Sequence, residues 1–290
     1  MSKTKKLIVI AGPTAVGKTT YAIKLAQQYD TEIISTDSRQ FYREMKIGTA
    51  SPTESELSAA PHHFIGNLSI HDYYNVSLYE QQAIAVIEKL FEAKDVVIAV
   101  GGSGLYIDAL CNGIDELPDA DPILRKSIID NFKQFGIKHL QDEVQKLDPE
   151  YFAMADMQNP KRLQRALEVI YSTGKSYSSQ RIQKLRPRNF EIEKIVLNMD
   201  RGILYHRINL RVDEMIHQGL EKEAMELYPY RDLNALNTVG YKEFFEFFDG
   251  KITREQAIID IKTHSRRYSK RQVTWFKRDD SFRWINVTES

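Results

Sequence analysis

The chain has 290 residues, of which 42% are hydrophobic and 28% are charged, a composition typical of a globular protein. Its 40 Lys and Arg residues balance its 40 Asp and Glu residues, so the overall charge predicts no particular partner. A single cysteine excludes an internal disulfide framework, and no apolar stretch is long enough to cross a bilayer. We therefore expect a soluble, cytoplasmic protein without a membrane partner.

The first predicted element is a buried parallel strand over residues 6–11, followed by a glycine-containing loop and a helix. The loop reads Gly12-Pro13-Thr14-Ala15-Val16-Gly17-Lys18-Thr19. In this context the pattern is typical of a phosphate-binding loop. Gly12 and Gly17 permit backbone angles that direct N–H groups at phosphate oxygens, and the helix N-terminus adds partial positive charge. Lys18 is expected to contact the outer phosphate and Thr19 to bind Mg²⁺, so the loop predicts a site for an unspecified polyphosphate.

A second short strand, predicted over residues 32–36, ends at Asp37-Ser38-Arg39-Gln40. Ligands of open parallel sheets bind outside the carboxyl ends of the strands, so Asp37 is expected to face the same site as the phosphate loop. A carboxylate at this position could be a metal ligand, a general base or a helix cap. Capping is the commonest of these roles where a strand leads into a helix.

The next segments include a turn, a helix and a third strand. Adjacent His62 and His63 cannot share one face of a helix or strand, so we predict a turn there and no metal site. A helix is predicted over residues 78–93, and a parallel strand over residues 95–100 leads into Gly101-Gly102-Ser103-Gly104. The lack of an acid after this strand argues against ordinary ATP hydrolysis. The glycines indicate either a tight turn or a ligand contact near Ser103, and both alternatives stay open.

Residues 115–190 show no strand pattern, and their Asp-Pro and Asn-Pro pairs indicate short helices. We predict an α/β, P-loop-like parallel sheet formed by residues 1–114 and 191–290, with this all-helical domain inserted. Residues 161–188 contain many basic side chains and a single acidic one, Glu168. This excess of positive charge favours contact with a phosphate backbone over a helix face that is merely solvated. The basic residues are Lys161, Arg162, Arg165, Lys175, Arg181, Lys184, Arg186 and Arg188.

The last third of the chain is predicted to be helical between strands over residues 194–199 and 282–287. A helix that begins near residue 200 places Arg207 and Arg211 on one face, either as solvated charges or as a second clamp for phosphates. Residues 262–278 contain no acid. Their basic side chains are interleaved with Tyr268, Trp275 and Phe276. Basic residues mixed with aromatic rings favour nucleic-acid binding.

Eight motifs, in one order over nearly the whole chain, resemble those of the bacterial tRNA dimethylallyltransferase family. They are Gly12–Thr19, Asp37–Gln40, Gly48–Ala50, Pro61–His63, Gly101–Tyr106, Arg162–Val169, Val239–Tyr241 and Lys270–Phe276. The resemblance implies transfer of a dimethylallyl group from dimethylallyl diphosphate to N6 of the adenosine on the 3′ side of a tRNA anticodon. It further implies that the loop binds this diphosphate rather than a nucleotide, with Mg²⁺ as cofactor.

The resemblance also assigns roles to single residues. Residues 12–19 are expected to bind the diphosphate, Lys18 and Arg211 to stabilise it as a leaving group, and Asp37 to act as the base. Ser103, where the family usually has threonine, keeps the hydroxyl that would orient the adenine. The residues matched to tRNA contacts are Asp37, Ser38, Arg39, Gln40, Ser103, Arg125, Lys161, Arg162, Leu163, Gln164, Arg165, Asn237, Thr238, Val239, Gly240, Tyr241, Lys242, Lys270, Arg271, Gln272, Val273, Thr274, Trp275, Phe276 and Lys277.

Two alternative functions would use the same loop. A P-loop kinase would hold ATP there and pass a hydroxyl proton to Asp37, which leaves the basic aromatic C-terminal helix unexplained. A non-catalytic RNA-binding ATPase switch predicts a metal-binding acid after the third strand, where the sequence has Gly101. We expect a monomer because no long exposed apolar stripe is evident. The chain ends without the zinc-finger extension of eukaryotic relatives, which favours a bacterial source.

Overall fold

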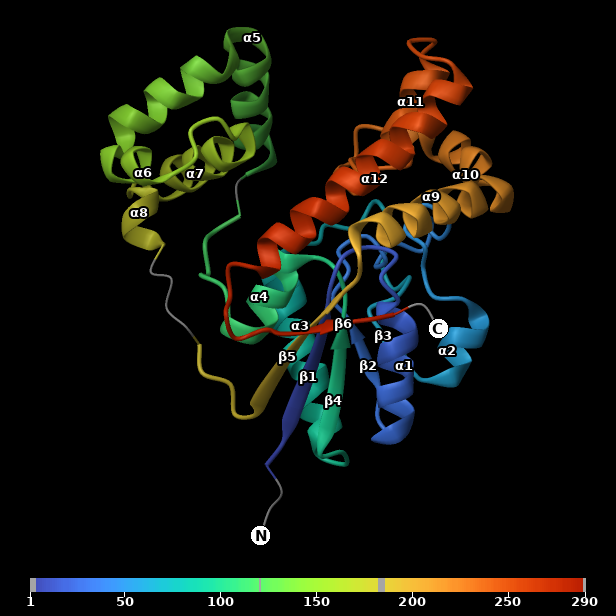
Figure 1. The fold of residues 1–290 in the computed structure, drawn as a ribbon. Coiled ribbons are helices and arrows are strands. Elements are labelled where there is room, and N and C mark those ends of the chain that lie inside the picture. Colours follow the sequence, from blue (N-terminus) through green and yellow to red (C-terminus); the bar gives the residue numbers. More distant parts are fainter. Residues whose placement is uncertain (1–3, 120, 182–185, 289–290) are drawn as a thin grey trace. The chain divides into compact units, whose positions relative to one another are not determined.

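The computed structural model of the protein describes residues 4–119, 121–181 and 186–288. The chain divides into two compact units (Figure 1). The first comprises Met1–Asn112 and Pro187–Ser290, and the second comprises Gly113–Arg186. Residues 187–190, which the sequence analysis included in the inserted domain, therefore belong to the first unit.

Within the described residues, the first unit is built on a parallel sheet of six strands (Figure 1). The strands are β1 (Lys6–Ala11), β2 (Ile33–Ser35), β3 (His62–His63), β4 (Val96–Val100), β5 (Glu191–Asn198) and β6 (Arg283–Asn286). Their spatial order is β3-β2-β4-β1-β5-β6, and every neighbouring pair is parallel. The predicted α/β parallel-sheet fold is confirmed.

The prediction of a turn at His62 and His63 was wrong. These residues pair with Ile33 and Ile34 as a short strand at the edge of the sheet. Adjacent side chains of a strand point to opposite faces. The adjacency of His62 and His63 argues against their binding one metal ion together, but it is compatible with a strand.

Helices cover both faces of the sheet. They are α1 (Lys18–Gln28) and α9 (Arg201–Gln218) on one face, and α3 (Val76–Phe91) and α4 (Gly104–Asn112) on the other. Ile8 and Ile10 of β1 pack with α1 and α9, whereas Leu7 and Val9 pack with α3 and α4. Burial on both faces explains why β1 is a continuous apolar run instead of an alternating one.

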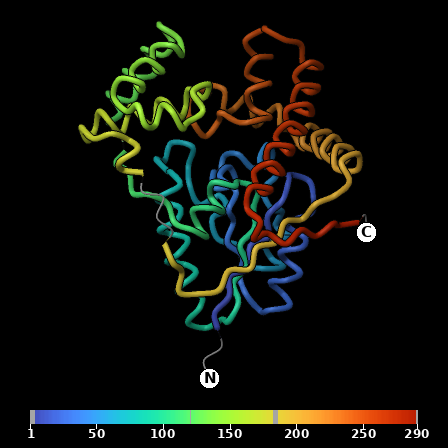
Figure 2. The backbone as a smooth tube through the Cα atoms, turned by 60° about the vertical axis from the view of Figure 1, so that its left-hand side comes forward, coloured from blue at the N-terminus to red at the C-terminus, as the bar shows by residue number. Residues whose placement is uncertain are grey.

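The C-terminal helices lie at the carboxyl end of the sheet. The remaining helical segments of the first unit are α2 (Glu54–Ala59), α10 (Leu220–Leu227), η1 (Tyr228–Tyr230), η2 (Asn234–Leu236), α11 (Tyr241–Phe248) and α12 (Arg254–Phe276). Helices α9 and α12 run side by side, in orange and red in Figures 1 and 2, and Arg266 donates a hydrogen bond to Asn209 between them. Helix α12 buries Ser269, Gln272 and Phe276 and exposes Arg267, Lys270 and Arg271 to solvent.

The described residues of the second unit form helices joined by loops, with no strand among them. It contains α5 (Pro122–Leu147), α6 (Pro149–Met154), α7 (Pro160–Thr173) and α8 (Tyr177–Gln180). As the Asp-Pro and Asn-Pro pairs predicted, Asp121, Asp148 and Asn159 cap the first three of these helices. Helix α5 bends at Gly136, where φ is 74°, so its two halves pack with α7 around one apolar core.

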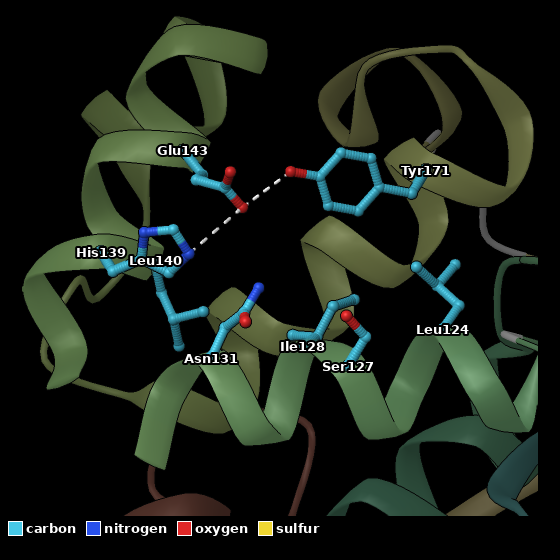
Figure 3. A pocket seen from close by; sticks show the side chains of 8 residues that line it. All are labelled: Leu124, Ser127, Ile128, Asn131, His139, Leu140, Glu143 and Tyr171. Atoms are coloured by element: carbon cyan, nitrogen blue, oxygen red, sulfur yellow. Dashed lines mark hydrogen bonds and ion pairs between the residues drawn. The ribbon is translucent and has the colours of Figure 1, made fainter. Parts of the chain in front are cut away.

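A cavity of about 310 Å³ opens in the second unit between the two halves of α5 and helix α7 (Figure 3). Ile128 and Leu140 are apolar parts of its lining. On its polar side the Tyr171 hydroxyl donates to Glu143 at 2.7 Å, and the Nε2 atom of His139 lies 3.9 Å from the same carboxylate oxygen. The predicted site residues are not among those that line this cavity.

We predict that Gly104→Ala lowers stability by about 1–3 kcal/mol through overpacking. A Cβ atom on Gly104 would lie 2.3 Å from Cδ1 of Trp275, so the indole would have to move. Gly202→Ala is the matched control, because Gly202 also lies in the first turn of a helix but faces only the side chain of Asp200. Thermal unfolding of both variants tests this, and an unchanged melting temperature for Gly104→Ala would contradict the packing argument.

Candidate functional site

The phosphate loop connects the end of β1 to the start of α1 and contains several left-handed residues. Gly12, Ala15 and Gly17 have φ values of 145°, 65° and 98°. A Cβ atom on Gly12 would lie 2.6 Å from the carbonyl oxygen of Leu197, so only glycine fits there. Such backbone angles turn N–H groups into a concave, anion-binding surface.

Lys18, Arg211 and Asp37 lie within electrostatic range of one another at this loop. Burial, together with the positive charge of Arg211, lowers the pKa of Lys18 to about 7, and the carboxylate of Asp37 opposes that shift. Burial also lowers the pKa of Arg211, again opposed by Asp37. The Lys18 ammonium donates a hydrogen bond to the Pro13 carbonyl at 2.7 Å. The structure thus brings together the residues to which the sequence analysis gave the main chemical roles.

Helix α9 directs two arginines at the loop. Arg211 donates hydrogen bonds of 3.5 Å to the Thr14 hydroxyl and to the Ala50 carbonyl. Arg207 Nη2 lies 4.0 Å from the position that a Cβ atom on Gly17 would take. Both side chains lie close to the loop, and their role as a clamp for phosphates stays a prediction.

Asp37 is half-buried just after β2. Its Oδ1 atom accepts the N–H of Arg39 at 3.0 Å, so it begins a turn and does not cap a helix. Next to it, the Ser103 hydroxyl accepts the N–H of Ser38 at 3.0 Å and donates to the Ser38 hydroxyl at 3.1 Å. Ser103 therefore connects the turn after β2 to the end of β4.

Arg39 and Gln40 extend this turn toward neighbouring loops. Arg39 donates hydrogen bonds of 2.9 and 3.1 Å to the carbonyls of Asn234 and Ala235. Gln40 donates hydrogen bonds of 3.3 and 3.1 Å to the carbonyls of residues 49 and 50. Both side chains hold the backbone around Asp37 in place.

Tyr268 of α12 belongs to the site, although the sequence analysis noted it only as one of several interleaved aromatic residues. Burial and the nearby charge of Asp37 raise the pKa of Tyr268 to about 12, while a hydrogen bond with Ser103 opposes the shift. The Arg271 guanidinium lies 5.6 Å from the centre of the Tyr268 ring. Tyr268 precedes Gln272 by four residues, so the two side chains lie on the same face of the helix. This spacing could have identified Tyr268 from the sequence.

The glycines after β4 make room for α12. A Cβ atom on Gly102 would lie 2.2 Å from Nε2 of Gln272, and a Cβ atom on Gly104 would lie 2.3 Å from Cδ1 of Trp275. Packing against α12, which was neither of the two alternatives considered for this segment, accounts for Gly102 and Gly104, and the ligand contact near Ser103 stays a prediction. Trp275 also donates a 2.9 Å hydrogen bond to Asp108 of α4.

Some side chains predicted to contact tRNA are buried in hydrophobic cores or between elements. They are Leu163, Gln164, Tyr241, Gln272 and Phe276, each at most 7% exposed. Tyr241 packs on Gly48 and donates a 2.7 Å hydrogen bond to Glu223, whose carboxylate also binds the N–H groups of residues 47 and 48. Burial removes these side chains from the solvent-accessible surface, and the tRNA contact of these residues stays a prediction.

Other predicted tRNA contacts are exposed. They are Lys161, Arg162, Asn237, Lys242, Lys270, Arg271, Thr274 and Lys277. In the second unit, Arg125 and Arg165 pair with the buried Glu168 at 2.8 and 3.3 Å. Arg188, also part of the predicted basic surface, forms a 2.6 Å ion pair with buried Glu80, whereas Lys184 lies outside the described residues. Some basic residues of these segments therefore pair with buried acids inside the protein, and only the exposed ones are available to a partner.

The loop offers one oxygen suited to a magnesium ion. In the described part of the chain, the Thr19 hydroxyl has no hydrogen-bond partner. The same residues hold no group of three or more His, Cys, Asp or Glu side chains that could form a metal cage. Mg²⁺ prefers hard oxygen ligands and usually combines one or two protein groups with phosphates and waters, so Thr19 fits this ion.

A strand, phosphate loop and helix at the carboxyl edge of a parallel sheet define a P-loop α/β protein. The sequence profile of the family described as "IPP transferase" matches residues 40–279. A "tRNA dimethylallyltransferase" of Christiangramia forsetii is 52% identical over 98% of this chain and 94% of its own length. A "tRNA dimethylallyltransferase 1" of Bacteroides fragilis is 48% identical over 97% of this chain and 94% of its own length. The chain belongs to the IPP transferase family.

Solved structures agree with this assignment. The tRNA isopentenylpyrophosphate transferase of Bacillus halodurans has a TM-score of 0.70 and 37% identity over 97% of this chain and 90% of that one. A eukaryotic dimethylallyltransferase described as acting on tRNA has a TM-score of 0.78 and 27% identity, over 99% and 75% of the two chains. None of the described helices has the length and apolarity needed to span a membrane.

We predict that diphosphate binding at pH 8 is accompanied by uptake of about one proton by Lys18, because an anion raises the pKa of a neighbouring ammonium. With a pKa of about 7, this side chain is mostly neutral at pH 8 in the free protein. The uptake should vanish well below pH 7, where Lys18 is already charged. Isothermal titration calorimetry in two buffers of different ionisation enthalpy measures it.

Lys18→Arg is the control for this measurement, because arginine stays charged throughout this pH range. The protonation of diphosphate itself is the same with both proteins, so the difference between them reports Lys18. Equal proton uptake by both proteins at pH 8 would contradict the lowered pKa.

Proposed function

We propose that the protein transfers a dimethylallyl group from dimethylallyl diphosphate to N6 of the adenosine on the 3′ side of a tRNA anticodon. The reaction forms N6-(dimethylallyl)adenosine and releases diphosphate. The observation that carries the proposal is the placement of Asp37 beside a phosphate loop flanked by Lys18 and Arg211. The relatives named as tRNA dimethylallyltransferases support it over nearly the whole chain.

The loop and its two cations stabilise the leaving group. Breaking the allylic C–O bond leaves positive charge on a resonance-stabilised carbon and negative charge on the diphosphate. Donors that are already oriented in a partly dehydrated site stabilise such developing charge most effectively. Lys18 and Arg211 approach the loop from α1 and α9, and their mutual repulsion is relieved when an anion binds. Charge separation in the donor is therefore favoured here.

Asp37 supplies the base on the acceptor side. The exocyclic amine of adenine is a weak nucleophile because its lone pair is delocalised into the ring. Once N6 forms its bond to carbon it becomes strongly acidic, so a carboxylate within reach can take its proton. The half-buried carboxylate of Asp37, fixed by the turn to Arg39, is suited to orient the amine and then accept that proton.

Mg²⁺ is proposed as the cofactor, with Thr19 as its protein ligand. When bound, the ion would neutralise part of the diphosphate charge. The protein residues contribute the rest of the charge stabilisation through the loop N–H groups, Lys18 and Arg211.

Two separate surfaces are proposed to contact tRNA: the exposed basic face of α12 in the first unit, and Lys161 and Arg162 of α7 in the second unit. Lys270, Arg271 and Lys277 are solvent-exposed on the side of α12 away from Gln272 and Phe276. Lysine and arginine side chains supply the sequence-independent part of RNA binding, and the target base must leave its stack to reach Asp37. The monomeric state and cytoplasmic location stay predictions.

We expect Asp37→Asn to lower kcat for transfer by about 10²–10⁴-fold, the usual contribution of a general base. Lys18→Ala is expected to lower it by about 10²–10³-fold through loss of leaving-group stabilisation. The assay mixes protein, Mg²⁺, radiolabelled dimethylallyl diphosphate and unmodified tRNA, and follows label in the tRNA. Asp30→Asn is the control, because Asp30 is a 97% exposed side chain that precedes β2, whereas Asp37 follows that strand.

Each outcome of this assay decides a different point. Full activity of Asp37→Asn would leave the transferase intact and remove its proposed base. If the wild-type protein consumed ATP and put no label into tRNA, the kinase alternative would replace the transferase.

A further inference from the structure

Gln272 of α12 connects the two halves of the proposed active site. Its side chain is buried, at 5% exposure. The Oε1 atom accepts the N–H of Thr14 in the phosphate loop at 2.9 Å. At the other end of the amide, Nε2 donates to the Gly102 carbonyl, also at 2.9 Å. One amide therefore joins the phosphate loop to the segment that follows β4.

Each end of this bridge leads directly to a reacting group. On the donor side, the Thr14 hydroxyl receives the hydrogen bond from Arg211, so the bridged residue also contacts the cation proposed to hold the diphosphate. On the acceptor side, Gly102 precedes Ser103, which is hydrogen-bonded to the neighbour of Asp37 in the chain. A continuous series of contacts therefore connects the group that holds the diphosphate to the turn that holds the base, and it passes through the side chain of Gln272.

Few side chains could replace this amide. Gln offers an acceptor and a donor on one rigid group, whereas Glu has no donor for the Gly102 carbonyl and Met has neither function. Asn is shorter by one methylene and cannot span both partners. Gly102 leaves no spare room either, because a Cβ atom there would lie 2.2 Å from Nε2. The local geometry therefore requires glutamine at position 272 and glycine at position 102.

We propose that Gln272 is a positioning residue that sets the separation between the allylic carbon of the donor and N6 of the acceptor adenine. This inference rests on the proposed function and deepens it. Attack on carbon needs the reacting atoms about 3–3.5 Å apart, and a misplacement of about 1 Å can cost about 100-fold in rate. Without the bridge, the phosphate loop and the turn that holds Asp37 are free to shift independently.

A misplaced acceptor also changes what happens to the donor. If N6 is out of reach when the allylic C–O bond breaks, a water oxygen forms the new bond to carbon. Diphosphate then leaves with the electrons of the broken bond, the water proton passes to solvent, and the product is dimethylallyl alcohol. The ratio of diphosphate released to label transferred therefore reports the position of the acceptor.

The experiment compares wild type with Gln272→Met, which keeps length and removes both hydrogen bonds, and Gln272→Glu, which keeps only the acceptor for Thr14. Gln256→Met is the matched control, because Gln256 is an exposed glutamine in the first turns of the same helix. Steady-state transfer, diphosphate release and thermal unfolding are measured for each protein. Should Gln272→Met fail to fold, Gln272→Glu decides the question.

We expect kcat for transfer to fall about 10- to 100-fold in the Gln272 variants, with both KM values within about threefold of wild type. The ratio of diphosphate to label should rise above one, while Gln256→Met behaves as wild type. An unchanged kcat would overturn the inference. A loss of activity that follows lost stability, with the ratio still at one, would overturn it too, by making Gln272 merely structural. A wild-type protein without transfer activity would instead refute the proposed function.

Discussion

Desolvated positive charge at the phosphate loop is the constraint on which the rest of the site depends. The loop N–H groups, the N-terminus of α1, Lys18 and Arg211 all present positive charge to one place, and burial lowers the pKa of both cations. Asp37 offsets only part of this charge. An anion with several negative oxygens satisfies such a site, so the binding of a diphosphate and its stabilisation as a leaving group use the same interactions.

Helix α12 gives this anion site its particular chemistry. Its buried face fits against the glycines after β4 through Gln272 and Trp275, and its opposite face exposes basic residues. The same helix also places Tyr268 beside Ser103 and Asp37. The position after β4 where a nucleotide hydrolysis site would have an acid is occupied by Gly101, and a Cβ atom there would lie 2.1 Å from the hydroxyl oxygen of Thr36. The fold thus combines a phosphate loop of a widespread type with a nucleic-acid surface built on its acceptor side.

The sequence predicted the strands, the loop and the gathering of Lys18, Arg211 and Asp37, because short-range patterns and the rule for parallel sheets determine them. It did not reveal β3, where two histidines join an edge by backbone pairing alone. Nor did it separate buried from exposed members of the predicted tRNA segments. Tyr241 and Gln272 are polar enough for a surface, and only their tertiary partners, Glu223 for one and Thr14 with Gly102 for the other, show that their side chains make internal contacts.

The most direct test of this account is to locate the product on the RNA. Unmodified tRNA treated with the protein, Mg²⁺ and dimethylallyl diphosphate is digested, and the modified nucleoside is identified and placed in the sequence by mass spectrometry. The account predicts a dimethylallyl group on N6 of the adenosine next to the anticodon on its 3′ side, and none when that adenosine is replaced by guanosine. Modification at another position or atom, or a phosphorylated product formed from ATP, would contradict it.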